Sequence, residues 1–309
     1  MASIVSNPTE TKNESSVDAK KGNEKGNISP LVEATISEAA VGYDVEVAAE
    51  NAEDTADIAS DSDDSDMDGL GFMFDNLQAT KSSTYTLPLP LCEGSSKDQM
   101  EIRVSIEAID DNPGACISGH YLWPASMLMA NHLVNNRLDY QGYNRALEVG
   151  SGSGMGGIVT ALIGGGEVVM TDHDHGVLKR CERNTEITDE VGGEGQKEIK
   201  GRCKFQEVRW GNKVDIDRVG EGGRFDLVVG ADVIYSSEVV GILYETVGGV
   251  MEEGGVFLMA QSFVYDEDTE REIEKECEKR GWKRNVLFEN WEEEGEGERG
   301  KIQTFGKKA

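Results

Sequence analysis

The fold of this chain is decided by the stretch Leu147-Glu-Val-Gly-Ser-Gly-Ser-Gly-Met-Gly-Gly157. An apolar strand that runs through a glycine-rich turn into a helix is typical of an open α/β sheet whose first turn binds a ligand. Glycines at 150, 152 and 154 let the backbone turn sharply and approach that ligand. The helix that follows offers unpaired N–H groups. The dinucleotide fingerprint needs glycine where this chain has Met155, so the turn favours a ligand without a pyrophosphate.

Strands and helices alternate on both sides of this turn. The pattern predicts strands at 145–149, 167–171, 203–208, 225–229 and 256–260, helices at 157–163, 177–188, 238–251 and 267–280, and two last strands at 283–288 and 301–305. Continuous apolar strands belong inside a sheet covered on both faces, and the alternation makes that sheet mainly parallel. The sequence therefore predicts a Rossmann-like α/β fold that ends in an antiparallel hairpin at one edge. The acidic run 292–298 would form the solvated tip of that hairpin.

Two further elements precede the glycine-rich turn. Residues 84–89 and 100–106 read as the strands of an N-terminal β-hairpin, and prolines in the first strand favour an edge position for it. The stretch after Trp123 has helical spacing, and Pro124 suits a first helical turn.

Acidic residues dominate the composition. The chain has 59 Asp and Glu against 30 Lys and Arg, which gives a formal net charge of −29. That charge disfavours nucleic acid as a partner, because phosphate contacts need a basic face. Residues 1–80 contain 18 acidic and 4 basic residues and too little apolar surface for a core, which predicts a disordered acidic tail before a domain at 81–309. No apolar run approaches the roughly 20 residues that span a bilayer, and no transit or signal peptide opens the chain.

The densest acidic stretch is Ser60-Asp-Ser-Asp-Asp-Ser-Asp-Met-Asp-Gly69, and it comes near a calcium-loop pattern. Asp75 stands where that pattern has a bidentate Glu, and Gly71 stands where it has an apolar residue. A solvated charge run is the preferred interpretation. Phosphorylation of Ser60, Ser62 or Ser65 and recruitment of a partner are alternatives.

Cysteine usage points to a reducing compartment. The five cysteines are an odd number, lie far apart and form no C-x-x-C pair, which disfavours a disulfide framework and a zinc site. His173 and His175 flank Asp174 without a third ligand, so we expect loop histidines and no metal. We expect a monomer without membrane association in the cytoplasm, or in the nucleus as well.

The predicted strand ends carry a constellation of polar and aromatic residues. Asp172 ends the second strand 22 residues after Gly150, where an acid would hold a ribose diol, although a helix cap is the alternative. Trp210 ends the third strand, where it could lie against a flat base. Asp232 and Tyr235 follow the fourth strand. A ribose acid, an aromatic residue for a base and a glycine turn without pyrophosphate geometry together indicate S-adenosylmethionine.

Five motifs in order resemble the seven-β-strand lysine methyltransferases of the methyltransferase-16 family. They are Gly119-His-Tyr-Leu-Trp-Pro-Ala-Ser126, the glycine-rich stretch 147–157, Thr171-Asp172, Trp210-Gly211 and Gly230-Ala-Asp-Val-Ile-Tyr235. The likeness covers roughly residues 84–307, and the acidic tail has no counterpart in it. Val149 and Met155 stand where Leu is commoner in the family, and both remain apolar.

The resemblance implies a site for S-adenosylmethionine and a site for the substrate. It implies cofactor contacts at Trp123, Gly150, Ser151, Gly152, Asp172, Trp210 and Ala231, beside Gly154 of the same turn. It also implies that Asp232 and Tyr235 face the substrate lysine. The expected function is methylation of lysine side chains in a non-histone protein, and an acidic surface would attract such segments.

Two alternatives remain open from the sequence. The enzyme could methylate another nitrogen, on a histidine or a small molecule, since the D-x-x-Y element describes a nitrogen pocket and not a named partner. A protein that binds the cofactor without catalysis is the other, and the complete set of cofactor residues counts against it. The N-P-P-Y type sequence of enzymes that methylate planar amide or base nitrogens is missing after the fourth strand, which disfavours nucleic acid and glutamine as substrates.

Overall fold

The computed structural model describes residues 45–47, 80–90, 101–109, 115–292 and 297–307. Most of the predicted acidic tail lies outside the described residues, including the calcium-loop candidate and its three serines. Residues 293–296 of the acidic run predicted as a hairpin tip lie outside them as well. Three residues within the predicted tail form a short strand, β1 (Val45–Val47), which the sequence analysis did not anticipate.

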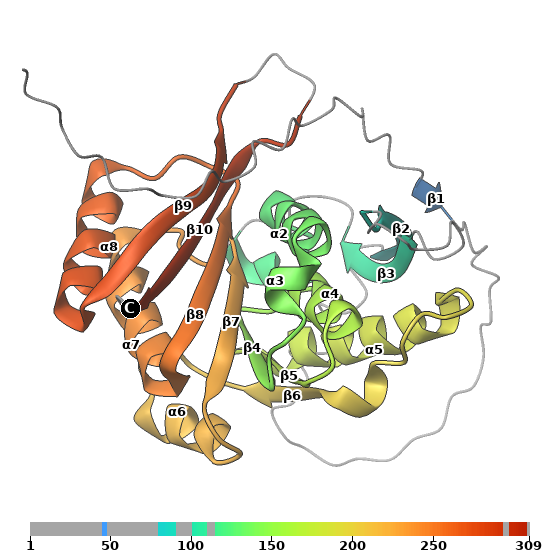
Figure 1. Ribbon diagram of the computed structural model, residues 1–309, viewed down its shortest axis with the longest axis horizontal. Helices are drawn as coiled ribbons and strands as arrows, with labels where there is room; N and C mark the ends of the chain where they lie inside the picture. The colour runs from blue at the N-terminus through green and yellow to red at the C-terminus, as the bar shows by residue number, and fades with distance from the viewer. Residues whose placement is uncertain (1–44, 48–79, 91–100, 110–114, 293–296, 308–309) are drawn as a thin grey trace, which may run out of the picture. The chain divides into compact units, whose positions relative to one another are not determined.

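The main sheet has seven strands in the order β6-β5-β4-β7-β8-β10-β9 (Figure 1). Its strands are β4 (Arg145–Val149), β5 (Glu167–Asp172), β6 (Cys203–Glu207), β7 (Phe225–Ala231), β8 (Met251–Gln261), β9 (Trp282–Asn290) and β10 (Gly300–Lys307). The first five are parallel, and β10 pairs antiparallel with both β8 and β9. The predicted mainly parallel sheet with a C-terminal antiparallel hairpin is confirmed. The hairpin inserts its second strand into the sheet, so β9 forms the edge.

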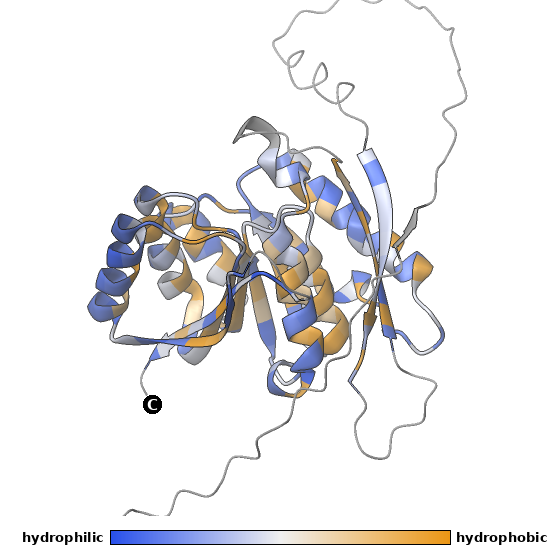
Figure 2. Ribbon diagram, turned by 90° about the horizontal axis from the view of Figure 1, so that it is seen from above, coloured by the Kyte–Doolittle hydropathy of each residue, from blue (hydrophilic) through white to orange (hydrophobic). Residues whose placement is uncertain are grey.

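Helices cover both faces of this sheet. They are α2 (Pro124–Asn135), α3 (Arg137–Tyr140), α4 (Met155–Ile163), α5 (His175–Val191), α6 (Lys213–Gly220), α7 (Ser237–Val250) and α8 (Glu267–Arg280), with 3-10 helices η1 (Ala115–His120) and η2 (Lys200–Arg202). Helices α2, α4 and α5 lie on one face, and α6, α7 and α8 on the other (Figure 1). Figure 2 shows hydrophilic residues along the outer surface of α8, at the left of the view.

The interior strands separate two hydrophobic cores. In β8, Phe257 and Met259 join the core beneath α7 and α8, whereas Leu258 and Ala260 join the core beneath α2 and α4. Successive side chains of a strand point to opposite faces, so a strand covered on both sides is apolar at every position. This explains why the sequence of β8 shows a continuous apolar run.

The sequence analysis missed helix α6. Helix α6 begins after Asn212, whose side-chain oxygen accepts hydrogen bonds from Val214 N (3.0 Å) and Asp215 N (3.2 Å). It buries Ile216 and Val219 against the core and spans only eight residues. Asn212 is a strong N-cap residue, and this was the local signal for the helix.

A second, three-stranded sheet has the order β1-β2-β3, with β2 (Thr80–Pro88) and β3 (Glu101–Ile109) antiparallel. The predicted N-terminal hairpin is confirmed. The predicted edge position of its first strand is wrong, because β1 pairs with β2 and makes it the central strand. Pro88 is the last residue of β2, where a missing N–H interrupts no ladder. Within the described part of the chain, no helix combines the length and apolar character needed to cross a membrane.

Candidate active site

The strand order reverses between β4 and β7, because the chain runs outward from β4 to β6 and then returns to β7 on the other side. Side chains beyond the carboxyl ends of strands meet at such a point, which is where open α/β sheets bind ligands. Gly150 follows β4, and Val233 follows β7. A Cβ built on Gly150 would lie 3.1 Å from Cγ1 of Val233, so the two strand ends are in contact.

The turn after β4 needs glycine for its backbone angles. Gly150, Gly152 and Gly154 have φ values of +61°, +51° and +85°, in the left-handed region that L-residues with a Cβ rarely adopt. Gly154 also needs the space, because a Cβ there would lie 2.4 Å from the Cys181 sulfur on α5. Gly154 is the residue before α4, and its nearest neighbours belong to α5 and β5. We call residues 150–154 the glycine loop.

Backbone hydrogen bonds tie the glycine loop to the end of β5. Ser151 N and Oγ both donate to Thr171 O, at 2.9 and 3.1 Å. Gly152 N donates to Oδ2 of Asp172 at 3.2 Å. Ser151 and Asp172 are both buried. The sequence prediction that the first glycines and Asp172 lie together is therefore confirmed by their contacts.

Asp172 is not the cap of the following helix. Its Oδ1 accepts hydrogen bonds from His173 N (2.8 Å) and Asp174 N (3.2 Å), and the His173 ring lies 3.1 Å away. The cap of α5 is Asp174, which accepts from Gly176 N and Val177 N. The pKa of His173 is raised, chiefly by its hydrogen bond with Asp172. Two backbone N–H groups and the His173 ring lie on Oδ1, whereas Oδ2 accepts from Gly152 N alone among the described residues, which leaves an acceptor site on Oδ2 for one hydroxyl.

A second buried acid lies under the glycine loop. Glu148 in β4 is 4% exposed, and its Oε1 and Oε2 lie 2.5 and 2.7 Å from the positions that a Cβ would take on Gly156 and Gly157. The two glycines at the start of α4 thus make room for this carboxyl. Burial raises the pKa of Glu148 to about 8, against hydrogen bonds that lower it. The sequence analysis did not single out Glu148.

Trp210 lies three residues beyond the end of β6, in a turn and not at the strand end itself. It is half-buried, and its Cζ2 atom is 3.2 Å from the position of a Cβ on Gly150. The turn is held by a hydrogen bond from Gly211 N to Thr246 Oγ1 (2.9 Å). Trp210 therefore lies beside the glycine loop, and glycine at 150 leaves room for the indole edge to approach the backbone.

The motif around Trp123 borders the glycine loop from another direction. Trp123 precedes α2 with extended backbone angles, Pro124 is the first helical residue as predicted, and the indole N–H donates to Ser118 O at 3.0 Å. A Cβ on Gly152 would lie 3.3 Å from Gly119 O. The Gly119 carbonyl in η1 therefore borders the glycine loop.

Asp232 lies beyond the end of β7 and has a φ of +51°, the one positive value of a non-glycine residue among the described residues. Its carboxylate accepts hydrogen bonds from Ser262 N (2.8 Å), Ser262 Oγ (2.6 Å) and Ala125 N (3.3 Å). Burial raises the pKa of Asp232, and these hydrogen bonds lower it. A half-buried acid with a left-handed backbone conformation and three hydrogen-bond donors is a feature of functional sites.

Ser262 is a site residue that the sequence analysis missed. It follows Gln261, the last residue of β8, and β8 is the neighbour of β7. The signal was its place one residue beyond a parallel strand, as for the other site residues. Ala231, the last residue of β7, is half-buried and packs against the core beneath α2 and α4. Tyr235 is 70% exposed.

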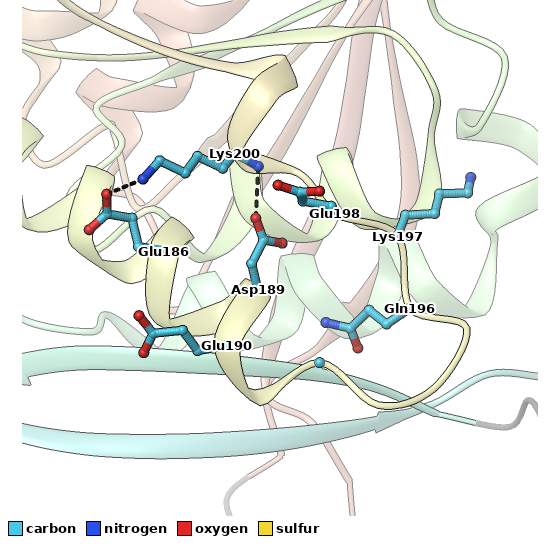
Figure 3. A pocket seen from close by; sticks show the side chains of 8 residues that line it. Glu186, Asp189, Glu190, Gln196, Lys197, Glu198 and Lys200 are labelled. Atoms are coloured by element: carbon cyan, nitrogen blue, oxygen red, sulfur yellow. Dashed lines mark hydrogen bonds and ion pairs between the residues drawn. The ribbon is translucent and has the colours of Figure 1, made fainter.

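A cavity of about 490 Å³ lies elsewhere, at the C-terminal end of α5 (Figure 3). Its polar walls come from α5 and from the segment that leads to η2. Lys200 contributes an ion pair with Glu186 (2.6 Å) and a backbone N–H that donates to Asp189 (2.9 Å). None of the predicted site residues lines this cavity, so we place the candidate site at the strand ends.

The chain is similar to known protein methyltransferases. The family model described as lysine methyltransferase matches residues 103–274. Mouse protein N-lysine methyltransferase METTL21A is 30% identical over 148 residues, which are 48% of this chain and 62% of the relative. Mouse EEF1A lysine methyltransferase 3 is 26% identical over 187 residues, covering 55% of this chain and 74% of the relative. A histidine protein methyltransferase 1 homolog of Dictyostelium discoideum is 24% identical over 160 residues, covering 52% of this chain and 48% of the relative.

Proposed function

This chain belongs to the lysine methyltransferase family, and on that premise we propose that it is an S-adenosylmethionine-dependent N-methyltransferase of protein lysine side chains. The match to mouse METTL21A covers 62% of that relative, so we state the activity and the substrate of this chain as proposals. The observation that carries it is the placement of Asp172 and Asp232 on the two sides of the glycine loop, at the carboxyl ends of β5 and β7. A non-histone protein is the proposed substrate.

The glycine loop and Asp172 fit the adenosyl part of the cofactor. The left-handed glycines leave backbone space that any Cβ would fill, and Asp172 retains acceptor capacity for a ribose hydroxyl. We assign cofactor binding to Gly150, Ser151 and Gly152 of the loop, with Gly154 closing it, and to Trp123, Asp172, Trp210 and Ala231. Trp210 would lie beside the adenine, because its indole edge borders Gly150.

S-adenosylmethionine, when bound, supplies an electrophilic methyl group for in-line displacement by a neutral amine. The protein then mainly has to align that amine. A lysine side chain with an ordinary pKa of about 10.4 arrives protonated at neutral pH, and desolvation favours loss of the proton. The Asp232 carboxylate would attract the ammonium group and orient the amine, while the Ser262 hydroxyl and two backbone N–H groups hold the carboxylate. Tyr235 would line the entrance, where its exposed ring can contact the substrate.

Methylation of a histidine nitrogen is the second candidate, because one relative is a histidine protein methyltransferase homolog. A small-molecule nitrogen and cofactor binding without catalysis are the further alternatives, and neither of them gives labelled protein. The test is transfer of a labelled methyl group from S-adenosylmethionine into proteins of a cell lysate, followed by mass spectrometry of the modified residue. Methyl-lysine supports the proposal, methyl-histidine supports the second candidate, and absence of labelled protein despite cofactor binding contradicts both.

The proposal also covers the partner, the compartment, the oligomeric state and the domain bounds of this protein. The net charge of −29 supports a protein partner over nucleic acid. Cys181, Cys203 and Cys277 are buried free thiols, which supports a reducing compartment, the cytoplasm with or without the nucleus. We propose a monomer that does not associate with membranes, with a catalytic domain at 81–309 after an acidic tail at 1–80. Light scattering of the full chain measures the oligomeric state.

A further inference from the structure

Among the described residues, strand β3 has one edge that pairs with no other strand, although an isolated parallel bridge joins its last residue, Ile109, to Tyr121. On its other edge it pairs with β2, and the free edge faces α5 and the segment that follows α5. Unpaired N–H and C=O groups along an edge are a liability that proteins cover in some way. In this protein side chains cover them at three alternate residues, Arg103, Ser105 and Glu107.

Each of these residues has its N–H and its C=O bonded to one side chain. Gln196, which also lines the cavity shown in Figure 3, accepts from Arg103 N (2.8 Å) and donates to Arg103 O (2.9 Å). The Thr188 hydroxyl does the same for Ser105, at 3.1 and 3.2 Å. These polar side chains take the place of a neighbouring strand, and they fix the small sheet against α5.

Asn184 covers the third position, Glu107, and has an additional partner. Its Oδ1 accepts from Glu107 N (2.8 Å), and its Nδ2 donates both to Glu107 O (3.2 Å) and to Ser153 O (2.8 Å). The side chain is wholly buried, and its acceptor and both amide N–H groups are used. Because the amide group is planar, the position of Glu107 and the position of Ser153 constrain each other.

Ser153 belongs to the glycine loop. Gly152 before it donates to Asp172, and Gly154 after it leads into α4. Glycines at 152 and 154 give this segment large conformational freedom in the absence of tertiary contacts. A buried hydrogen bond to the Ser153 carbonyl therefore restricts the part of the loop that a ligand must find in place. The Thr188 and Gln196 side chains make no hydrogen bond to the loop among the described residues.

We propose that Asn184 is a positioning residue that couples the docking of the N-terminal sheet to the affinity of the glycine loop for its cofactor. The inference rests on the proposed function of the loop. Removing the Asn184 amide removes the hydrogen bonds both to Ser153 O and to Glu107 in β3. Removing the Thr188 hydroxyl removes hydrogen bonds to β3 alone. Coupling between two sites is reciprocal, so cofactor binding also holds β3 more firmly on α5.

The first experiment compares Asn184→Leu with Thr188→Val, a matched control one turn later on the same helix. Both variants replace a buried polar side chain by an apolar one of similar size and remove hydrogen bonds to β3. Calorimetry measures the Kd of S-adenosylhomocysteine. We expect Asn184→Leu to weaken binding at least tenfold and Thr188→Val to change it less than threefold. Equal Kd values for the two variants overturn the coupling.

The second experiment uses the wild-type chain and so does not depend on the folding of a variant. Hydrogen exchange followed by mass spectrometry reports the protection of residues 101–109 with and without S-adenosylhomocysteine. We expect the cofactor product to slow exchange in this strand severalfold, because Glu107 N is bonded to Asn184. Unchanged exchange in β3 overturns the coupling. Wild-type protein that gives no heat with S-adenosylhomocysteine contradicts the proposed function itself, whereas wild-type binding without a difference between the variants contradicts only the role of Asn184.

Discussion

Residues at the carboxyl ends of β4 and β5 are buried, whereas several residues that follow β7 and β8 are exposed to solvent. We call the first group the closed region and the second group the open region. In the closed region Ser151, Ser153 and Asp172 are buried, and backbone hydrogen bonds fix the glycine loop. In the open region Tyr235, Phe263 and Val264 are 70%, 38% and 64% exposed. A closed, preorganised region suits a ligand of constant shape, since little ordering remains to be done on binding. Exposed aromatic and apolar side chains suit the surface of a protein substrate.

Asp232 is a half-buried residue of the open region, and its substitution gives the largest expected effect. We predict that Asp232→Asn lowers kcat about 10²–10³-fold, because a preorganised charge beside the reacting nitrogen is lost. Cofactor Kd should change less than twofold. Asparagine tolerates a φ of +51°, so the backbone is kept. Steady-state methyl transfer measures kcat, and calorimetry measures the cofactor Kd. A variant that loses cofactor affinity along with turnover would show that Asp232 contributes to cofactor binding.

In the closed region the corresponding variant is Asp172→Ala. A hydrogen bond to a charged group is worth about 1.5–3 kcal/mol, so we predict a cofactor Kd about 10–100-fold weaker. Calorimetry with S-adenosylhomocysteine provides the measurement.

Asp174→Ala is the matched control for Asp172→Ala. It removes the cap of α5, at about 1 kcal/mol of unfolding free energy, and leaves the carboxylate of Asp172 in place. If the two variants lose cofactor affinity equally, Asp172 acts through the helix and not through the ribose.

Glu148 tests how much ionisation of a buried carboxyl destabilises the closed region. The unfolded chain loses this proton near an ordinary pKa of 4.5, whereas the folded protein keeps it up to a pKa of about 8. Between these values the unfolded state binds fewer protons, so stability falls as pH rises. We predict that Glu148→Gln gains about 1.4 kcal/mol of unfolding free energy relative to the wild type for each pH unit between 5 and 7.5. Urea unfolding at three pH values measures this gain, and parallel pH profiles would show that Glu148 ionises in the fold.

The elements predicted best from the sequence have local signals at both ends. Strand β4 matches its predicted range to the residue, because an apolar run stops at Gly150. Helix α8 does so as well, since Asp266 caps its start and Gly281 adopts the left-handed conformation at its end. Helix α6 was missed because eight residues with two buried apolar side chains show little periodicity.

The site was predictable where it consists of strand ends and not where it depends on tertiary partners. Asp172 and Asp232 follow apolar strands, so their place at one edge of a parallel sheet follows from the pattern. Ser262 also lies one residue beyond a strand, but its bond to Asp232 and the bond of Asn184 to Ser153 join residues about 30 apart in the chain, and no periodicity in the sequence indicates such pairs. The three-residue strand β1 has no pattern of its own and is identified by its pairing with β2.

Deletion of the N-terminal segment has the smallest expected effect. It tests whether that segment is required for cofactor binding by the closed region. Deleting residues 1–75 removes β1 and exposes one edge of β2, while β3 stays fixed to α5 by the side chains of Asn184 and Thr188. Because the bond from Asn184 to Ser153 links β3 to the glycine loop and is kept, we predict kcat and cofactor Kd within twofold of the full chain, with a Tm lower by a few degrees. Deleting residues 1–44 keeps β1 and should leave Tm unchanged. Loss of folding in the longer deletion, with the shorter one intact, would show that residues 45–75, which include β1, are required for folding of the domain, and that this domain extends into the segment predicted as a tail.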